Sequence, residues 1–280
     1  MKWRCQDTVF DLSREGVIMG ILNVTPDSFS DGGKFDRVEN AVARVGEMLA
    51  EGAGIIDIGG ESTRPGADRV SDVDEKDRVV PVIETVLKDF PETVISIDTS
   101  KASVAEAAIS AGAKIINDVT GFQDPEMIRV AAETGAGIVV MHMQGTPGTM
   151  QKNPTYKDVV SEVRAFFEDK HHELITAGVD PETVSYDPGI GFGKTLDHNL
   201  TLLKNIERLD VDGRPLLLGV SRKSFIGKIL GSDKVEDRNW PTVAITSNAR
   251  EQGVRLHRVH EVKPNFEALR MTEAIINVRA

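Results

Sequence analysis

Residues 216 to 223 read Leu-Leu-Leu-Gly-Val-Ser-Arg-Lys, an apolar run that passes directly into a hydroxyl, a guanidinium and an ammonium group. A parallel strand that is covered on both faces is apolar along its length instead of alternating. Polar side chains at the end of such a strand lie at the rim of a core, where a ligand can reach them. A surface turn after a strand explains one such stretch equally well, so a binding site is indicated only if the pattern recurs.

The pattern recurs along the chain. Further apolar runs with polar ends occupy residues 17–22, 55–58, 94–97, 114–116, 137–141, 184–186 and 254–259. Amphipathic helical patterns lie between them, for example over residues 39–51 and over residues 101–111, where Thr99 and Ser100 are the expected capping residues. Several helices are expected to end at a glycine shortly before the next strand, namely at Gly52, Gly112, Gly135 and Gly253.

Eight strand–helix units without a break in composition predict an α/β fold, a single parallel (β/α)8 TIM barrel. We expect this barrel to occupy residues 17–280 and residues 1–16 to form a short N-terminal extension, either a small lid or a hairpin. The length of 280 residues agrees, because such barrels typically run to about 250 residues.

Composition narrows the class of protein. The chain is 40% hydrophobic and 28% charged, which is ordinary for a soluble globular protein, and its apolar runs are too short to span a membrane. The N-terminus has no apolar segment of the signal-peptide type, and Cys5 has no second cysteine to pair with, so we expect a cytoplasmic protein. A net charge of −11 argues against nucleic acid as a partner.

Active sites of such barrels lie at the carboxyl ends of the strands. The polar residues expected to meet there are Asn23, Asp57, Arg64, Asp98, Asn117, Asp187, Lys223, Arg258 and His260. The fold alone does not specify a reaction.

One group of these residues suits a flat heterocycle. Asp98, Asn117 and Asp187, together with Lys223, could match a ring edge with adjacent donors and acceptors, because a carboxylate accepts two parallel N–H groups. Asp98 could instead cap a helix, since it precedes Thr99. Asp187 is followed by Pro188 and by the glycine-rich residues 189–194, where backbone could approach a ligand.

A second group suits an anion. The guanidinium groups of Arg64 and Arg258 match phosphate oxygens, and two of them favour a diphosphate over a single carboxylate. Asn23 offers a neutral oxygen to a Mg²⁺ ion held mostly by phosphate and water. His260 could also be an ordinary histidine at a strand end. No set of residues has the spacing of a zinc site, and there is no Gly-x-Ser-x-Gly nucleophile motif.

Several blocks of sequence, in the correct order, resemble the motifs of the dihydropteroate synthase family of pterin-binding enzymes. They are residues 20–33, residues 57–66, Asp187-Pro188-Gly189, Ser221-Arg222-Lys223 and Arg258-Val259-His260. The resemblance extends from about Val17 to the C-terminus.

The resemblance implies a (β/α)8 barrel, usually a homodimer, that acts in folate biosynthesis and is a target of sulfonamides. Such a transferase joins 4-aminobenzoate to 6-hydroxymethyl-7,8-dihydropterin diphosphate, with Mg²⁺, and releases 7,8-dihydropteroate and diphosphate. Its partners are therefore small-molecule substrates, without nucleic acid or membrane.

The resemblance also assigns roles by position. Asp98, Asn117, Asp187, Lys223 and Arg258 would bind the pterin, with Asp98, Lys223 and Arg258 as the catalytic residues. Asn23, Arg64, Arg258 and His260 would hold the diphosphate, with Asn23 also binding the metal. Thr63, Phe192, Ser221 and Phe29 would border the 4-aminobenzoate, and Asp31 would lie with Phe29 on the first loop.

Two stretches depart from the family pattern. Glu261 stands where the family usually has aspartate, and residues 239–242, Asn-Trp-Pro-Thr, stand where it generally has small residues. The bulky Trp240 makes the usual dimer packing less certain.

Two other functions are compatible with the pterin-facing residues. A pterin-dependent methyltransferase would share the barrel and the acids, but it has no diphosphate to hold, so Arg64, Arg258 and His260 argue against it. A non-catalytic paralogue that binds pterin would be expected to have lost residues of the first loop or of the anion group, and both are present.

Overall fold

The computed structural model describes residues 1–25, 34–62, 69–146, 148–150 and 152–278. Its centre is an eight-stranded parallel sheet in the order β8-β7-β6-β5-β4-β3-β10-β9. The strands are β3 (Val17–Asn23), β4 (Ile55–Gly59), β5 (Ile95–Asp98), β6 (Ile115–Asp118), β7 (Gly137–Met141), β8 (Val184–Asp187), β9 (Leu217–Leu218) and β10 (Leu256–Val259). A parallel bridge between Tyr186 and Leu216 joins the two ends of the sheet, so the predicted barrel is confirmed.

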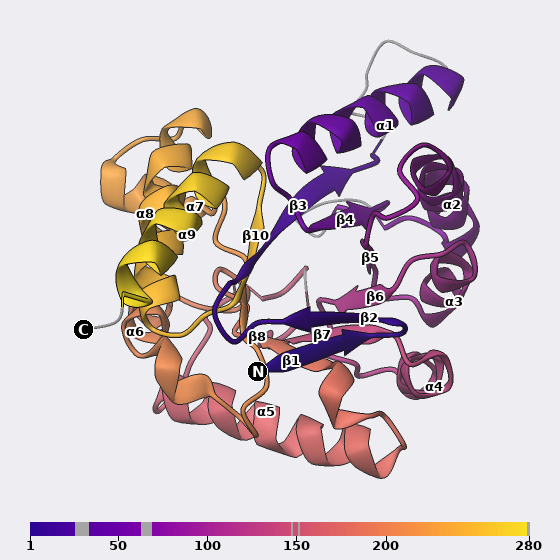
Figure 1. Cartoon of the computed structure of the whole chain (residues 1–280). Coiled ribbons are helices and arrows are strands. Elements are labelled where there is room, and N and C mark those ends of the chain that lie inside the picture. Colours follow the sequence, from indigo (N-terminus) through magenta and orange to yellow (C-terminus); the bar gives the residue numbers. More distant parts are fainter. Residues whose placement is uncertain (26–33, 63–68, 147, 151, 279–280) are drawn as a thin grey trace.

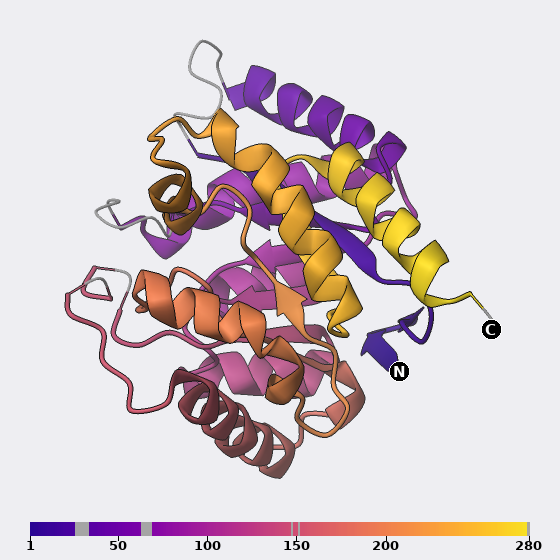
Figure 2. The same ribbon diagram turned by 90° about the vertical axis from the view of Figure 1, so that its left-hand side faces the viewer.

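Helices surround the strands (Figure 1). They are α1 (Lys34–Ala50), α2 (Asp72–Asp89), α3 (Ala102–Ser110), α4 (Pro125–Thr134), α5 (Val159–Thr176), α6 (Leu196–Lys204), α7 (Ser224–Leu230), α8 (Asn239–Glu251) and α9 (Val262–Ile276), with 3₁₀ turns η2 (Pro181–Thr183), η3 (Ile206–Leu209) and η4 (Glu236–Arg238). Figure 2 shows α8 and α9 side by side on the outside of the barrel. Within the described ranges, no helix has the length and apolar character needed to cross a membrane.

The predicted helix ends are confirmed at the glycines and wrong at one cap. Gly135 ends α4 in the left-handed region, with φ of 63°, and its N–H reaches the carbonyl of Ala131. The first residue of α3 is Ala102, and its N-cap Lys101 makes no side-chain capping bond. Thr99 instead accepts a hydrogen bond from the Lys101 N–H, 3.2 Å away, in the turn before the helix.

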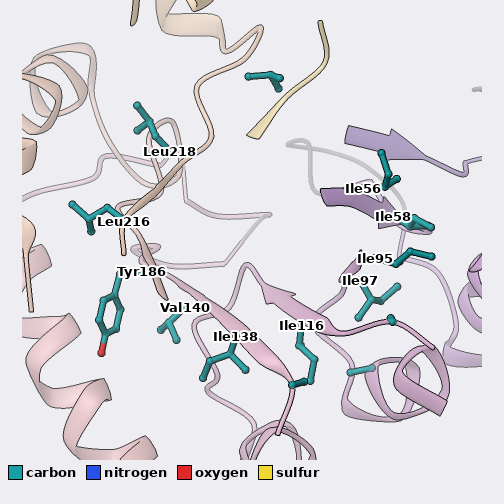
Figure 3. Close-up of a cluster of buried hydrophobic side chains, with 14 of the residues drawn as sticks. Ile56, Ile58, Ile95, Ile97, Ile116, Ile138, Val140, Tyr186, Leu216 and Leu218 are labelled. Atoms are coloured by element: carbon teal, nitrogen blue, oxygen red, sulfur yellow. The ribbon is translucent and has the colours of Figure 1, made fainter. Parts of the chain in front are cut away.

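The strands are buried on both faces, and alternate residues contribute to two different cores. Outward-facing residues such as Ile56, Ile97, Ile138 and Tyr186 pack against the helices in the main core (Figure 3). Inward-facing residues near the strand starts, among them Ile55, Ile115, Val139, Leu217 and Leu256, form a second cluster inside the barrel.

The N-terminal extension is a hairpin of β1 (Lys2–Cys5) and β2 (Thr8–Asp11) that closes the amino end of the barrel. Trp3, Cys5 and Leu12 are fully buried against the inner apolar cluster. The Trp3 indole N–H donates to the carbonyl of Thr183 over 2.8 Å. Of the two expected forms the hairpin is correct, and it covers the end of the barrel opposite to the strand carboxyl ends.

Candidate active site

Polar side chains line the barrel two residues beyond its inner apolar cluster. Because strand residues i and i+2 share a face, Asp57 follows Ile55, Asn117 follows Ile115, and Arg258 follows Leu256 on the inside of the barrel. These three strands thus each supply an apolar residue at the closed end and a polar one toward the open end.

Arg258 joins two of the strand-end acids. Its Nε donates to Asp57 Oδ2 and its Nη2 to Asp98 Oδ2, both over 2.6 Å. Asn117 Nδ2 donates to the same Asp57 carboxylate, 3.2 Å from Oδ2. Asp57, which is completely buried, therefore orients both the guanidinium and the amide.

Two carboxylates share the one guanidinium of Arg258, so their charges are only partly compensated. Burial raises the pKa of Asp98 to about 7, although the attraction of Arg258 opposes the shift. Its Oδ1 is buried and has no hydrogen-bond partner among the described residues. Because an unpaired buried acceptor is costly, this oxygen is suited to receive an N–H group from a ligand.

Asp187 lies beside this group. A Cβ at Gly219 would come within 3.5 Å of Asp187 Oδ2 and 3.9 Å of Arg258 Cδ, so the carboxylate and the arginine flank the same glycine. Asp187 Oδ1 accepts the N–H of Gly189 over 2.7 Å. Burial raises the pKa of Asp187, and this N–H and the nearby cations oppose that shift.

The glycine-rich residues 189–194 form the neighbouring wall. Gly189 has a φ of 64°, and a Cβ there would lie 2.0 Å from the carbonyl oxygen of His142, so only glycine fits. Lys223 Nζ lies 3.8 Å from the centroid of the Phe192 ring, a cation–π contact.

Lys194 connects this wall to His142, the residue that follows β7. Its buried Nζ lies 2.9 Å from His142 Nδ1, 3.2 Å from the His142 carbonyl and 3.0 Å from the Phe192 carbonyl. Burial lowers the pKa of Lys194 to about 7 and that of His142 to about 3. Burial thus disfavours the charged forms of both groups.

His260 and Asn23 lie on the other side of the opening. The Ser221 hydroxyl lies 2.9 Å from His260 Nδ1 and accepts the His260 backbone N–H over 3.2 Å. A cavity of about 490 Å³ is lined by Ile21, Leu22, Asn23, Arg44, Arg222, His260 and Glu261. A Cβ at Gly59 would lie 3.8 Å from Asn23 Oδ1 and 3.5 Å from Asp98 Cβ. Asn23, of the predicted anion-binding group, and Asp98, of the predicted pterin-binding group, therefore lie on either side of this glycine.

The structure therefore brings most of the predicted residues to one end of the barrel. They are Asn23, Asp98, Asn117, Asp187, Phe192, Ser221, Lys223, Arg258 and His260. Phe29, Asp31, Thr63 and Arg64 lie outside the described residues. Ser221 contacts His260, and this places its hydroxyl beside a predicted diphosphate residue.

Sequence reasoning gave no role to three residues that the geometry includes. Asp57 was visible as an acid inside an apolar run, and Lys194 as the end of the glycine-rich stretch. Arg44, on α1, had no such signal, because only the packing of α1 brings it within 3.4 Å of the His260 carbonyl. His171, on α5, is partly buried, with Nδ1 2.7 Å from the Tyr186 hydroxyl.

No group of three or more His, Cys, Asp or Glu side chains in the described part of the chain is arranged to hold a metal ion. Glu261 also lines the cavity but is ion-paired with Arg222, so the donors that remain are the neutral amide of Asn23 and the imidazole of His260. Such a set fits an ion held mostly by phosphate and water, since Mg²⁺ keeps several waters and uses few protein ligands.

Comparison with known proteins agrees with this arrangement. Residues 19–260 match the family described as pterin binding enzyme. The dihydropteroate synthase of Escherichia coli K12 is 46% identical over 279 residues, which cover 100% of this chain and 98% of that protein. The chain belongs to the dihydropteroate synthase family.

Solved structures of dihydropteroate synthases have the same fold. The Yersinia pestis enzyme in a sulfonamide drug complex has a TM-score of 0.92 and 43% identity, covering 99% of this chain and 100% of that one. The Xanthomonas albilineans enzyme with 4-aminobenzoic acid has a TM-score of 0.92 and 41% identity, covering 99% of each chain. The expected family, and with it the expectation of a pterin-binding transferase, is confirmed.

Proposed function

We propose that this chain joins 6-hydroxymethyl-7,8-dihydropterin diphosphate to 4-aminobenzoate, giving 7,8-dihydropteroate and diphosphate. The observation that carries the proposal is the inward set of Asp98, Asn117 and Asp187 around Arg258, with an unpaired acceptor on Asp98. A synthase in the family with 4-aminobenzoic acid bound supports the choice of second substrate.

The acids and the amide would bind the pterin ring by its polar edge. Asp187 is held by the Gly189 N–H through one oxygen, and Asp98 is held by Arg258 through one oxygen. Each carboxylate thus has a second oxygen for ring N–H groups, and Lys223, 3.8 Å from the Phe192 ring centroid, can donate to a ring acceptor.

These groups also suit the reaction. The bond between the pterin methylene carbon and the diphosphate oxygen breaks, and its electron pair leaves with the diphosphate. Positive charge then develops on the electron-rich pterin, where preorganised carboxylates stabilise it. The aminobenzoate nitrogen forms the new bond to the methylene carbon and loses a proton to solvent, so no residue has to form a covalent bond.

The leaving diphosphate would be held by Arg258, His260 and Asn23, together with Arg64. The cavity beside Asn23 and His260, about 490 Å³ in volume, has room for such an anion. Mg²⁺, when bound through Asn23, would supply positive charge to the leaving group. Phe192, Ser221, Thr63 and Phe29 would border the aminobenzoate.

The setting we propose is the bacterial type of folate biosynthesis, in the cytoplasm and as a homodimer. Cys5 is the single cysteine of the chain, so no internal disulfide can form, and its thiol is buried at the closed end of the barrel.

The test is a coupled assay for diphosphate with both substrates and Mg²⁺, with the pterin product identified by mass. We expect dihydropteroate and diphosphate in equal amounts. Diphosphate release at only the spontaneous rate, with pterin still bound in a titration, would instead support a non-catalytic pterin-binding paralogue. Transfer of a methyl group from a methylated tetrahydropterin, supplied in a separate assay, would support a methyltransferase.

A further inference from the structure

Arg222 has an unfavourable backbone conformation between two residues of the candidate site. Its φ is +60°, in the left-handed region, which is unfavourable for an L residue other than glycine. It follows Ser221 and precedes Lys223, the N-cap of α7. Strained residues of this kind persist only where the surroundings hold them, and they concentrate at functional sites.

Three neighbouring segments hold Arg222 in place. Its Nε donates to Asn239 Oδ1 over 3.0 Å, at the start of α8, and its Nη2 forms an ion pair with Glu261, after β10. Its backbone N–H lies 3.4 Å from Thr242 Oγ1, and its carbonyl accepts from Arg238 over 3.1 Å. Side chain and backbone are therefore both fixed, by residues that do not adjoin it in sequence.

The two neighbours of Arg222 reach different parts of the site. The Ser221 hydroxyl contacts His260, on the anion-binding side. The ammonium of Lys223, a predicted pterin ligand, lies over Phe192. The backbone torsions of Arg222 set the relative directions of these two side chains, so a change there would displace both.

The guanidinium of Arg222 borders the cavity that also contains Asn23 and His260. Its position beside Glu261 and Asn239 leaves two of its donors engaged by protein acceptors. This engagement favours an indirect role over direct binding of a phosphate group.

We propose that Arg222, held by Asn239 and Glu261, is a positioning residue that aligns Ser221 and Lys223, so that His260 and Lys223 bind the two ends of the pterin diphosphate together. The inference rests on the proposed function, because it assigns both ends of the site to one substrate.

The first variant is Arg222→Gly, which removes the guanidinium but accepts the left-handed backbone without strain. We expect the KM for the pterin diphosphate to rise about tenfold, as a loss of about 1.4 kcal/mol of binding would produce. We expect kcat to change much less, because the lost binding is made equally in the ground state and in the transition state. A purely structural role would lower kcat through a smaller active fraction and leave KM unchanged, which would overturn the proposal.

The second variant, Asn239→Ala, separates positioning from direct binding, because Asn239 does not line the cavity. We expect it to raise the same KM several-fold and to add nothing to Arg222→Gly in the double variant, since coupled residues are not additive. Asn248→Ala is the matched control: it removes the acceptor of Gln252 on the same helix, 2.9 Å away, and we expect it to leave KM unchanged. A normal KM in Asn239→Ala, with Arg222→Gly impaired, would make Arg222 a direct ligand and overturn the proposal.

Failure of the proposed function gives a different result. If the wild-type protein binds the pterin diphosphate without turnover, the proposed reaction is wrong, and calorimetric titration of the same variants still tests Arg222 through their Kd values. If the wild-type protein neither binds nor converts the pterin diphosphate, both proposals are wrong.

Discussion

Asp187 and Asp118 are two buried acids at strand ends with different environments. Asp187 faces into the barrel and has one oxygen on the Gly189 N–H. Asp118 faces outward, and its carboxylate accepts from the Thr120 N–H and hydroxyl and from the Phe122 N–H. Burial raises the pKa of both, so their difference in role must come from direction and from unused hydrogen-bonding capacity.

We expect Asp187→Asn to weaken pterin binding well over tenfold while the melting temperature changes little. Removing one partner of a buried charged hydrogen bond costs about 2–5 kcal/mol, and the amide presents a donor to the donors of the ring. Isothermal titration with a pterin measures the effect. Asp118→Asn is the control, expected to lower the melting temperature and keep the pterin Kd. Unchanged affinity in Asp187→Asn would make Asp187 a turn residue like Asp118.

The buried ammonium of Lys194 predicts a pH dependence of stability. Burial lowers its pKa from 10.5 to about 7, so the unfolded chain binds more protons at this group than the folded chain between these two values. The free-energy cost of burying the charged Lys194 in the folded protein is therefore fully present below pH 7. It disappears as the pH rises toward 10.5.

Relative to Lys194→Met, we expect the wild-type free energy of unfolding to increase by about 1.4 kcal/mol per pH unit within this window. Urea unfolding of both proteins at about pH 7.5, 8.5 and 9.5 checks how steeply the free energy of unfolding changes with pH. Parallel pH profiles for the two proteins would show that Lys194 remains protonated throughout.

Helices α8 and α9 are joined to each other and to the N-terminal segment by a buried ion cluster. Glu273 Oε1 lies 2.7 Å from Arg250 Nε, with the two side chains only 4% and 2% exposed, and it also accepts the Gly16 N–H. Arg250 donates further to the Arg14 carbonyl over 2.9 Å. One carboxylate thus fastens the connection from the hairpin to β3 against the last two helices.

We expect Glu273→Gln to lower the free energy of unfolding by about 3–5 kcal/mol, because it leaves the buried Arg250 charge without its partner. Chemical denaturation measures this loss, and the kinetic constants of the remaining folded enzyme are expected to stay normal. Glu133→Gln removes a partner of Arg129 in an exposed pair and is expected to cost at most about 1 kcal/mol. Equal losses in the two variants would contradict the importance of burial.

At the scale of the whole molecule, apolar side chains are exposed on elements that pack against one another. Ile229 and Leu230 on α7, Val235 before η4 and Trp240 on α8 are all exposed, Trp240 to 76%. Exposed apolar side chains on neighbouring elements commonly mark an interface, so they favour the predicted homodimer, in which the bulky Trp240 would have a place.

We expect the wild-type protein to sediment as a dimer and Trp240→Glu to sediment as a monomer at the same concentration. Burying a charge without a partner in an apolar interface is unfavourable, which is the reason for the expected dissociation. Val73→Glu, at an exposed position on α2, is the control and is expected to remain dimeric. A Trp240→Glu protein that stays dimeric would place the interface elsewhere.

The sequence by itself determined the barrel and which polar residues would gather at its open end. Eight apolar runs alternating with helical patterns, in a chain of this length, favour a closed barrel, and parallel connections bring every strand end to the same side. Asp98, Asn117, Asp187 and Arg258 could therefore be predicted from their positions at strand ends alone. The motifs then selected the family, which the comparisons confirmed.

Tertiary structure decided how these residues act on one another. Asp57 and Arg258 are 201 positions apart, and His142 and Lys194 are 52 apart, so no local pattern specifies either contact. The sequence of the N-terminal extension is compatible with either a lid or a hairpin, and only the burial of Trp3 in the inner apolar cluster places it at the closed end. The periodicity of apolar residues in the sequence indicates which face of a helix or strand is buried. Charge pairing and desolvation depend instead on which side chains from distant parts of the chain are buried next to each other. Only the folded chain brings those side chains together.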